Sequence, residues 1–431
     1  MLHQITISGS QSLAFWPILI AMINAHPEVT GRSEGGEKAV IRVGITEGDI
    51  CATDNRALQA AMDYVAGLGG GTVQIAPGTY PMRNALTLRD HVRVVGVPGE
   101  TVLAICDTAQ SPLAKDGDCN QREISLADPA GFRVGDGVAV SDTRYGGGFC
   151  VTTATLTGLR DANVFAISRP LYLDYCVSKC ATARLVFPGV RGDQITHAAI
   201  EGLTIEGNRE NSSWLDGCRG GGIYLFECND VVIRNCVVRG YNGDGVSFQV
   251  SSDVIVEDCR VEGNAGCGLH PGSGSQRPIV RHNHSVGNDG EGMFVCWRVQ
   301  HGLFEANELR ANERDGISIG HKDSDNVFRN NAILENKGAG ITFRQEDEPM
   351  GAHRNLFEDN RILDNAGAGP HKAVVLITGN HKDLVFRNNA IGNTKPGGPA
   401  QTGIFLGKDA AGLQSDGNQF MHIQKQVKSE R

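Results

Sequence analysis

A repeat of roughly 24 residues is the feature of this sequence that most constrains its fold. A Gly followed by an aliphatic residue or Met recurs at intervals of 23 or 24 residues, at Gly222, Gly245, Gly268, Gly292, Gly316 and Gly340. Asn283, Asn307 and Asn331 keep the same period. A fixed period of this length indicates stacked supersecondary units, each in contact with its neighbours, instead of one globular core.

The repeating unit is built from short strands. Runs rich in Val, Ile and Phe, such as 231–233, 254–256 and 317–319, are separated by Gly, Asn and Asp, which favour turns. One repeat has the size of one coil, or rung, of a right-handed parallel β-helix, whose rungs stack about 4.8 Å apart. The regular Leu of a leucine-rich repeat is missing, and the 56 Gly and the lack of a long apolar run exclude a coiled coil or a transmembrane bundle.

The Asn repeat predicts a specific interaction inside the coil. A buried Asn at the same turn of each rung can hydrogen-bond to its copies above and below, and so satisfy backbone groups that the turn leaves unpaired. Cys236 and Cys259 lie one rung apart beside this series, and we expect stacked buried thiols there, not a disulfide or a metal pair. The predicted ladder consists of Asn235, Asp258, Asn283, Asn307, Asn331, Asn360 and Asn389.

Charge and composition restrict the partners. The 431 residues carry a net charge of -9 and no long Lys or Arg cluster, which excludes nucleic acid as a partner. The twelve Cys have no regular spacing; Cys176 with Cys180, and Cys106 with Cys119, would pair only in an oxidising compartment, and we expect free thiols. Residues 12–23 are apolar but lack the basic start of a secretory segment, so we expect a packed helix there and leave the location, secreted or periplasmic included, open.

The repeat does not cover the whole chain. Thr53 or Asp54 is a good N-cap for a helix with an apolar face of Leu58, Ala61, Met62 and Val65. Residues 105–195 break the rhythm and are rich in Asp, Gly and Thr, which indicates a β-rich insertion on the side of the coil. We therefore expect an N-terminal lead-in (1–45), a helix cap with the first rungs (46–104), the insertion (105–195), regular rungs (196–395) and a C-terminal tail (396–431).

The segment around the predicted helix resembles a known superfamily. The run from Asp54 through Gly69–Val73, the turn at Pro77–Tyr80 and the strand Val92–Gly96 resemble the opening of the pectate-lyase superfamily. The resemblance implies an all-β, right-handed, single-stranded parallel β-helix whose N-terminal helix closes one end. Lyases, hydrolases, epimerases and phage tailspikes share this opening, so it implies a carbohydrate-active protein but no single reaction.

Laying the rungs in register predicts a functional face. Side chains alternate along a strand, so Val246, Leu269, Met293 and their equivalents point inward, and the residues between them point outward. The outward face and its flanking turns concentrate His, Arg, Trp, Tyr and carboxylates over five rungs, which is unlike a merely solvated sheet. The catalytic candidates are His270, Asp244, Arg298, His321, Asp315 and Arg344; the substrate-binding candidates are Tyr224, Gln249, Glu291, Trp297, Lys322, Asp323, Gln345 and Glu346.

Two reactions fit this face. Elimination or epimerisation at a uronate needs a base, here His270 or His321, and a cation such as Arg298, Lys322 or Arg344 for the carboxylate. Hydrolysis needs two carboxyls, which Asp244, Glu291 and Asp315 would supply from near-adjacent rungs. We expect cleavage of a glycosidic bond by β-elimination at a uronate, with hydrolysis as the alternative and a non-catalytic carbohydrate-binding or tailspike-like protein as the third hypothesis.

Two families resemble the repeat region in part. Residues 265–345 resemble alginate C5-epimerases: Gly268–Gly272 stands where that family has Gly-aromatic-Asp-Pro-His, and Arg314 matches the family's Arg. Asn242–Gly245 and Gly316–Gly320 resemble the Asp-Gly and Gly-x-Ser-Ile-Gly motifs of polygalacturonases. The resemblances imply a polysaccharide or oligosaccharide partner, no membrane and, by analogy, a homotrimer. No ligand spacing demands a metal, although the groove carboxylates would suit Ca²⁺.

Overall fold

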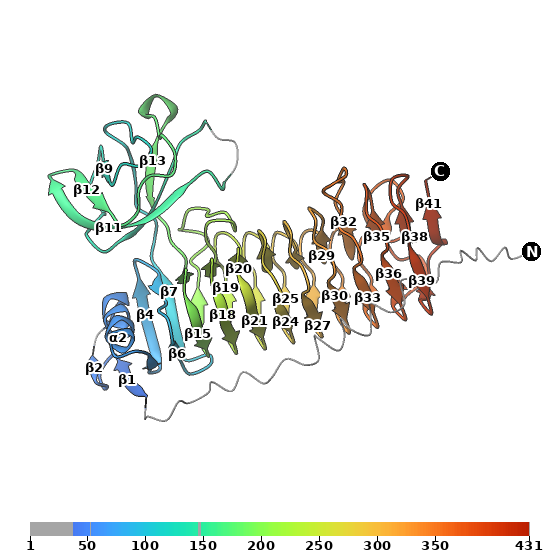
Figure 1. Cartoon of the computed structure of the whole chain (residues 1–431), viewed down its shortest axis with the longest axis horizontal. Helices are drawn as coiled ribbons and strands as arrows, with labels where there is room; N and C mark the ends of the chain where they lie inside the picture. The colour runs from blue at the N-terminus through green and yellow to red at the C-terminus, as the bar shows by residue number, and fades with distance from the viewer. Residues whose placement is uncertain (1–37, 52, 145–147, 431) are drawn as a thin grey trace, which may run out of the picture. The chain divides into compact units, whose positions relative to one another are not determined.

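The computed structural model describes residues 38–51, 53–144 and 148–430. The expected helix at residues 12–23 lies outside the described residues. Within them the chain visits three parallel sheets in turn and adds one strand to each sheet per rung (Figure 1). This is the parallel β-helix that the repeat predicts.

The first sheet contains thirteen strands. In spatial order they are β2 (Ile50–Cys51), β1 (Ala39–Gly44), β3 (Gly71–Ile75), β6 (Val92–Val95), β15 (Thr196–Glu201), β18 (Asn229–Arg234), β21 (Ser252–Glu257), β24 (Ile279–Arg281), β27 (Leu303–Glu305), β30 (Val327–Arg329), β33 (Leu356–Glu358), β36 (Val385–Arg387) and β39 (Gln414–Asp416).

The second and third sheets contain eleven strands each. The second sheet consists of β4 (Gly78–Met82), β7 (Thr101–Ile105), β16 (Thr204–Glu206), β19 (Val237–Arg239), β22 (Arg260–Glu262), β25 (His284–Val286), β28 (Glu308–Arg310), β31 (Ala332–Leu334), β34 (Arg361–Leu363), β37 (Ala390–Gly392) and β40 (Gln419–Met421). The third consists of β5 (Leu86–Thr87), β14 (Val190–Asp193), β17 (Ile223–Phe226), β20 (Val246–Gln249), β23 (Leu269–Gly272), β26 (Met293–Phe294), β29 (Ile317–Ile319), β32 (Ile341–Phe343), β35 (Ala373–Ile377), β38 (Thr402–Leu406) and β41 (Lys425–Ser429).

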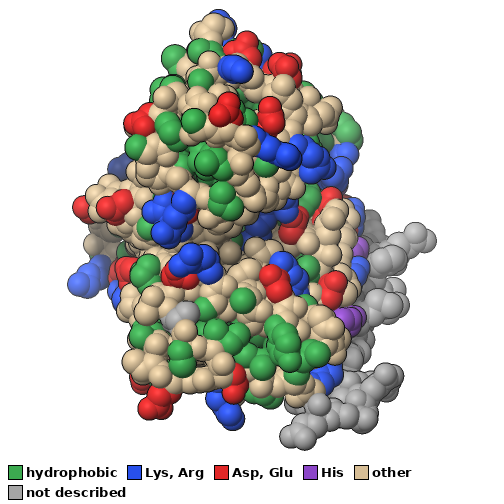
Figure 2. All heavy atoms as spheres, turned by 90° about the vertical axis from the view of Figure 1, so that its left-hand side faces the viewer, with side chains coloured by type: hydrophobic (Ala, Val, Ile, Leu, Met, Phe, Trp, Pro, Cys, Tyr) green, Lys and Arg blue, Asp and Glu red, His purple; other side chains and the backbone are tan. Residues whose placement is uncertain are grey.

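Helix α2 (Asn55–Gly67) packs against the first rungs. Asp54 is its N-cap and accepts a hydrogen bond from the Arg56 amide at 3.0 Å. Its buried face contains the four expected residues, Leu58, Ala61, Met62 and Val65. On the surface seen from the α2 end, Lys and Arg alternate with Asp and Glu, and no single charge dominates (Figure 2). No helix in the described part of the chain is long and apolar enough to span a membrane.

A separate antiparallel sheet is inserted between β7 and β14. Its six strands, in spatial order, are β8 (Gln110–Pro112), β13 (Thr182–Leu185), β10 (Gly137–Ser141), β11 (Thr152–Asp161), β12 (Val164–Ile167) and β9 (Glu123–Ser125), with the short 3₁₀ helix η1 (Val177–Lys179) between β12 and β13. A small apolar cluster of Ala139, Val151, Val186 and Leu215 packs this sheet against the loop before β17. The cluster therefore anchors that loop, which covers part of the groove described below.

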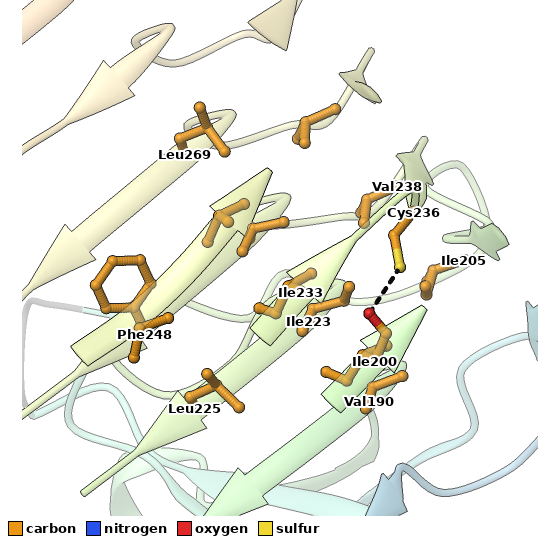
Figure 3. Packing of buried hydrophobic residues seen from close by; sticks show 14 of the residues in the cluster. Val190, Ile200, Ile205, Ile223, Leu225, Ile233, Cys236, Val238, Phe248 and Leu269 are labelled. Carbon is orange, nitrogen blue, oxygen red and sulfur yellow. Dashed lines mark hydrogen bonds between the residues drawn. The ribbon is translucent and has the colours of Figure 1, made fainter. Parts of the chain in front are cut away.

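The inside of the coil is apolar and continuous. Ile223, Leu225, Phe248 and Leu269 point into it from the third sheet and meet residues of the other two sheets (Figure 3). Phe304, Phe328, Phe357 and Phe386 stack with ring centroids 4.5–4.8 Å apart, one per rung of the first sheet. All twelve Cys, which lie within the described residues, are free thiols.

The Asn ladder is present. In its first two rungs, the ladder position lies one residue later in the sequence than we expected. From Asn283 onward, each Asn donates its backbone amide to the side-chain oxygen of the Asn in the next rung. The Asn307 Oδ1 accepts the Asn283 amide at 3.1 Å, and the Asn307 Nδ2 donates to the Val280 carbonyl at 2.8 Å. In the two rungs before it, Cys259 and Cys236 occupy the ladder position, and the Cys236 thiol donates to the Ile200 carbonyl at 3.7 Å (Figure 3).

The expectation that Asn235 and Asp258 belong to the ladder is therefore wrong. Both are exposed and have a left-handed φ, 53° and 54°, as the turn residue just before the ladder position. Asn and Asp tolerate that conformation better than other non-Gly residues. Asn and Asp are thus favoured at the left-handed turn position for their backbone conformation, and Asn is favoured at the adjacent ladder position for its hydrogen bonds. The sequence alone did not separate the two positions.

The ladder makes a testable contribution to stability. Asn307→Ala removes a group that satisfies the buried Asn283 amide and the buried Val280 carbonyl, so we expect the free energy of unfolding to fall by at least about 2 kcal/mol. Lys337→Ala breaks only an exposed ion pair with Glu313 and should change the free energy of unfolding by less than about 1 kcal/mol. Urea unfolding followed by circular dichroism measures both, and equal effects of the two substitutions would contradict the ladder's role.

Candidate functional site

A pocket of about 670 Å³ lies on the outer face of the third sheet, beside β20, β23 and β26. Its residues come from the insertion, the loop before β17, and the turns and strands of five successive rungs. They include Phe149, Trp214, Asp216, Cys218, Arg219, Asp244, Gln249, Cys267, His270, Asp289, Glu291, Phe294, Cys296, Trp297, Arg314 and His321.

The strand register places the expected outward residues in one row. Tyr224 pairs with Ser247, Ser247 with His270, and Phe294 with Ser318 along the third sheet. The row is not solvated, because the loop before β17 covers part of it: the Ser247 hydroxyl donates to the Gly217 carbonyl at 2.6 Å. Gly217 lies so close to Asp244 and His270 that a Cβ there would collide with both side chains.

Asp244 and His270 form the buried end of the site. The Asp244 Oδ2 lies 2.7 Å from the His270 Nδ1, and the Asp244 Oδ1 accepts the Cys267 amide at 2.8 Å. His270 is 4% exposed, and its ring meets the edge of Phe294 at 5.1 Å. Its other nitrogen, Nε2, is enclosed and has no hydrogen-bond partner among the described residues.

Cys296 and His321 continue the row from the next two rungs. The Cys296 Sγ lies 3.6 Å from the His321 Nδ1, and the His321 Nε2 lies 2.9 Å from Glu346 Oε1. The His321 ring stacks on Trp297 at 5.1 Å. Asp244, His270, Cys296, His321 and Glu346 thus form a chain of titratable groups, one from each of five successive rungs, which we call the polar row.

The two His of the polar row have opposite protonation preferences. Burial by itself lowers the pKa of His270, but its hydrogen bond with Asp244 and its interaction with Cys296 outweigh burial and raise that pKa to about 10. Burial and the Arg344 guanidinium lower the pKa of His321 below its ordinary value of 6.5. At neutral pH His270 is therefore an imidazolium and His321 a neutral imidazole.

The raised pKa of His270 also links the site to stability. The folded protein holds this proton more tightly than the unfolded chain, so the stabilising contribution is complete below pH 6.5 and is lost as the pH rises through about 10.

Arg344 and Asp323 pack beside the polar row and bind the backbone and side chains around it. The Arg344 guanidinium lies 4.6 Å from the Phe294 ring centroid and donates to the Ser318 Oγ and to the Val295 carbonyl, both at 2.9 Å. Asp323 is fully buried and accepts the Val299 and Gly320 amides at 2.9 and 3.1 Å. Burial raises the pKa of Asp323 to about 7. These contacts make Asp323 a residue that orders the turn after β29 and not one that faces the pocket.

The three carboxylates expected for hydrolysis all have hydrogen-bond partners, although Asp244 and Glu291 also line the pocket. Asp244 holds His270 and a backbone amide, and Asp315 accepts the Ala339 amide of the next rung at 2.7 Å. Burial raises the pKa of Asp315. Glu291 accepts the Cys267 thiol at 3.2 Å and lies 3.8 Å from the Arg314 guanidinium.

The remaining expected residues are dispersed. Gln249 lines the pocket, and its Oε1 is enclosed without a partner among the described residues. Tyr224 is buried and donates to the Cys218 carbonyl at 2.8 Å. As the described residues define the pocket, Tyr224, Arg298, Lys322 and Gln345 are not among those that line it.

Residues distant in the sequence complete the pocket. Phe149 and Trp214 are about half exposed, and the Arg219 Nε donates to the Phe149 carbonyl at 2.7 Å. No periodicity marks these residues, because they come from the insertion and from a long loop. Cys296 lies at the outward position two residues after Phe294, where the alternation of side chains along the strand predicts it.

Metal binding has no obvious place in this part of the chain. Among residues 38–51, 53–144 and 148–430, no three His, Cys, Asp or Glu side chains converge as metal ligands.

Comparisons with known proteins agree with the fold. A family model for the right-handed β-helix region matches residues 174–299 and 295–427, together more than half of the chain. The mannuronan C5-epimerase AlgE6 of Azotobacter vinelandii is 41% identical over 68 residues, which cover 14% of this chain and 8% of that protein. The chain thus spans only a small part of this relative.

Solved structures match over most of the chain. The A-module of the mannuronan C-5 epimerase AlgE4 of Azotobacter vinelandii has a TM-score of 0.53 at 18% identity and covers 90% of this chain and 99% of its own. A hyperthermoactive exopolygalacturonase from Thermotoga maritima has a TM-score of 0.54 at 12% identity and covers 96% and 95%. At these identities the similarity shows the fold alone.

The protonation state of His270 can be tested directly. Asp244→Asn keeps an oxygen for the Cys267 amide but removes the negative charge, so burial should dominate and the pKa of His270 should fall from about 10 to near or below 6.5. Nuclear magnetic resonance of the imidazole protons, titrated with pH, measures this change. Asp289→Asn alters a carboxylate of the same pocket that pairs with Arg209 and should leave His270 unchanged. A His270 still protonated above neutral pH in Asp244→Asn would contradict the assignment.

Proposed function

This chain belongs to the right-handed β-helix family, and we propose that its groove cleaves a uronate-containing polysaccharide by β-elimination. The similar proteins support a polysaccharide as the substrate class, since they are named for action on mannuronan and polygalacturonate. Both polymers consist of uronates, whose carboxyl group makes the neighbouring C5 proton removable.

Elimination needs an acidic and a basic group at one site. The base takes the C5 proton, the C5–H electron pair forms the C4–C5 double bond, and the C4–O4 bond breaks with its electron pair passing to the leaving oxygen. Two titratable groups whose surroundings push their pKa values apart are suited to these roles. His321 is the basic member of the pair and His270 the acidic member.

The pocket walls suit an acidic sugar chain. Phe149, Trp214 and Trp297 are 52%, 48% and 46% exposed, and aromatic faces left in water at a pocket rim favour a bound partner. Arg219 and Arg314 supply positive charge for a uronate carboxylate, as does the His270 imidazolium within the wall.

One observation carries the proposal. His270 and His321 flank the same pocket wall with opposite protonation states, whereas Asp244 and Asp315 are tied to backbone amides of the following rungs. A hydrolase requires two carboxyls free to act on the glycosidic bond and on water. The arrangement therefore favours proton abstraction over hydrolysis.

The reaction can be identified with a panel of uronate polymers. We expect mannuronan or polygalacturonate to yield the ultraviolet absorbance of an unsaturated uronate together with new reducing ends. His270→Gln and His321→Gln should each lower turnover at least about 100-fold, which is the usual contribution of a positioned acid or base.

A matched control is available on another face of the coil. His284 is half exposed and pairs with Glu308, so His284→Gln should keep full turnover. Reducing ends without absorbance would identify a hydrolase, and inversion at C5 without cleavage would identify an epimerase. Either result would overturn the elimination proposal.

The two His also predict a pH profile. Activity should rise as His321 loses its proton, with a midpoint below pH 6.5, and fall as His270 loses its proton near pH 10. The profile is therefore a bell whose broad maximum spans neutral and mildly alkaline pH, measured as initial rates at low substrate concentration. In Asp244→Asn the alkaline limb should move to lower pH. An activity maximum confined to acid pH would contradict these roles.

A further inference from the structure

The atom of the polar row that is in position to meet a substrate is the thiol sulfur of Cys296. The His270 Nε2 is enclosed, and the His321 Nδ1 points toward Cys296 and Arg344, at 3.6 and 3.4 Å. The His321 Nε2 is taken by Glu346. Cys296 itself lines the pocket and is only partly buried.

We propose that Cys296 is the group that takes the C5 proton, as a thiolate whose own proton has passed to the His321 imidazole 3.6 Å away. The inference rests on the proposed elimination and places the sulfur between the basic His321 and the C5 proton, so that His321 acts through the thiolate. His321 then carries the thiol proton, His270 is a positioning residue that acts through the sulfur, and Asp244 and Glu346 orient the two imidazoles from the ends of the row.

The surroundings of Cys296 suit a thiolate, which is the reactive form of the side chain. An imidazolium on one side and an imidazole able to accept the thiol proton on the other are the neighbours that make a Cys reactive. The interaction with Cys296 is among the causes that raise the pKa of His270. The nearby cation Arg344 adds to the positive potential on the His321 side.

The proton steps balance without a further reactant. The Cys296 proton passes to the His321 Nδ1 and leaves a thiolate next to the His270 imidazolium. The thiolate takes the C5 proton, the released electron pair forms the C4–C5 double bond, and the C4–O4 bond breaks. A water molecule then gives a proton to the leaving O4 and takes the proton of the His321 Nδ1 in return, so the thiol and the neutral imidazole are restored.

Two other Cys of the pocket lack these neighbours and serve as internal references. Burial and the carboxylates of Asp244 and Glu291 raise the pKa of Cys267 well above its ordinary value. Burial and Asp216 raise the pKa of Cys218 as well. Both thiols line the same pocket, so a difference from Cys296 reflects the immediate environment and not access to the pocket.

Alkylation of the full-length protein tests the thiolate without any substrate. Iodoacetamide modification, quantified for each Cys by peptide mass spectrometry, should be fastest at Cys296 among the three pocket thiols. The exposed thiol Cys51 serves as the reference for general thiol reactivity. His270→Gln and His321→Gln should each slow the reaction of Cys296 and leave that of Cys51 unchanged. A Cys296 that reacts no faster than Cys218 and Cys267 would overturn the proposal.

Turnover provides the second test. Cys296→Ser keeps the size of the side chain but replaces the thiol by a much weaker acid, so turnover should fall at least about 100-fold with little change in KM. Cys51→Ser is the control and should be fully active. An active wild type together with an active Cys296→Ser would overturn the role of Cys296 alone. A wild type inactive on every uronate polymer would count against the proposed function instead, and the alkylation comparison would then decide the assignment of the thiolate.

Discussion

The structure depends on the exact repetition of backbone hydrogen bonds from rung to rung. Each strand of the three parallel sheets pairs with the equivalent strand of the next rung, and the turns between them leave buried amides and carbonyls that no strand can satisfy. The Asn ladder satisfies these groups at one turn, and a second ladder of Asn264, Asn288, Asn312, Asn336 and Asn365 does so at another. Both ladders continue where the rung lengthens from 24 to 29 residues, at Asn331–Asn360 and Asn336–Asn365, so the turn position is kept although the rung length changes.

The same regularity creates the site. A residue at a given position of the third sheet lies next to its counterpart in the following rung, so a polar row can be assembled from single residues of Asp244, His270, Cys296, His321 and Glu346. Asp244, His270 and Glu346 are buried in this row, whereas Cys296 and His321 are partly exposed at the pocket. The opposite pKa shifts of the two His follow from this arrangement, because the bond with Asp244 outweighs burial at His270, whereas burial and the Arg344 guanidinium together lower the pKa of His321.

The sequence predicted most of the coil but only part of the groove. The Gly and Asn periods were enough to predict the parallel β-helix, its inward residues and the row from Ser247 to Ser318. They could not show that Tyr224 is covered, because that depends on the loop before β17, which lies outside the repeat. They also could not show that Asp323 is fully buried, because its side chain turns back to the amides of Val299 and Gly320. The misplacement of Asn235 and Asp258 had a local cause, since a left-handed turn position and a ladder position stand side by side and favour the same residues.

By itself, the sequence determined the fold, the rung register and which residues share the outer face, because these follow from periodicity and from the alternation of side chains along a strand. Only the tertiary structure decided which of those residues act together. The loop before β17 and the inserted sheet close over one part of the face, bury His270 against Asp244, and leave Cys296 at the pocket wall. Burial and the identity of the nearest charge set the protonation of each group, and neither quantity is contained in a linear pattern.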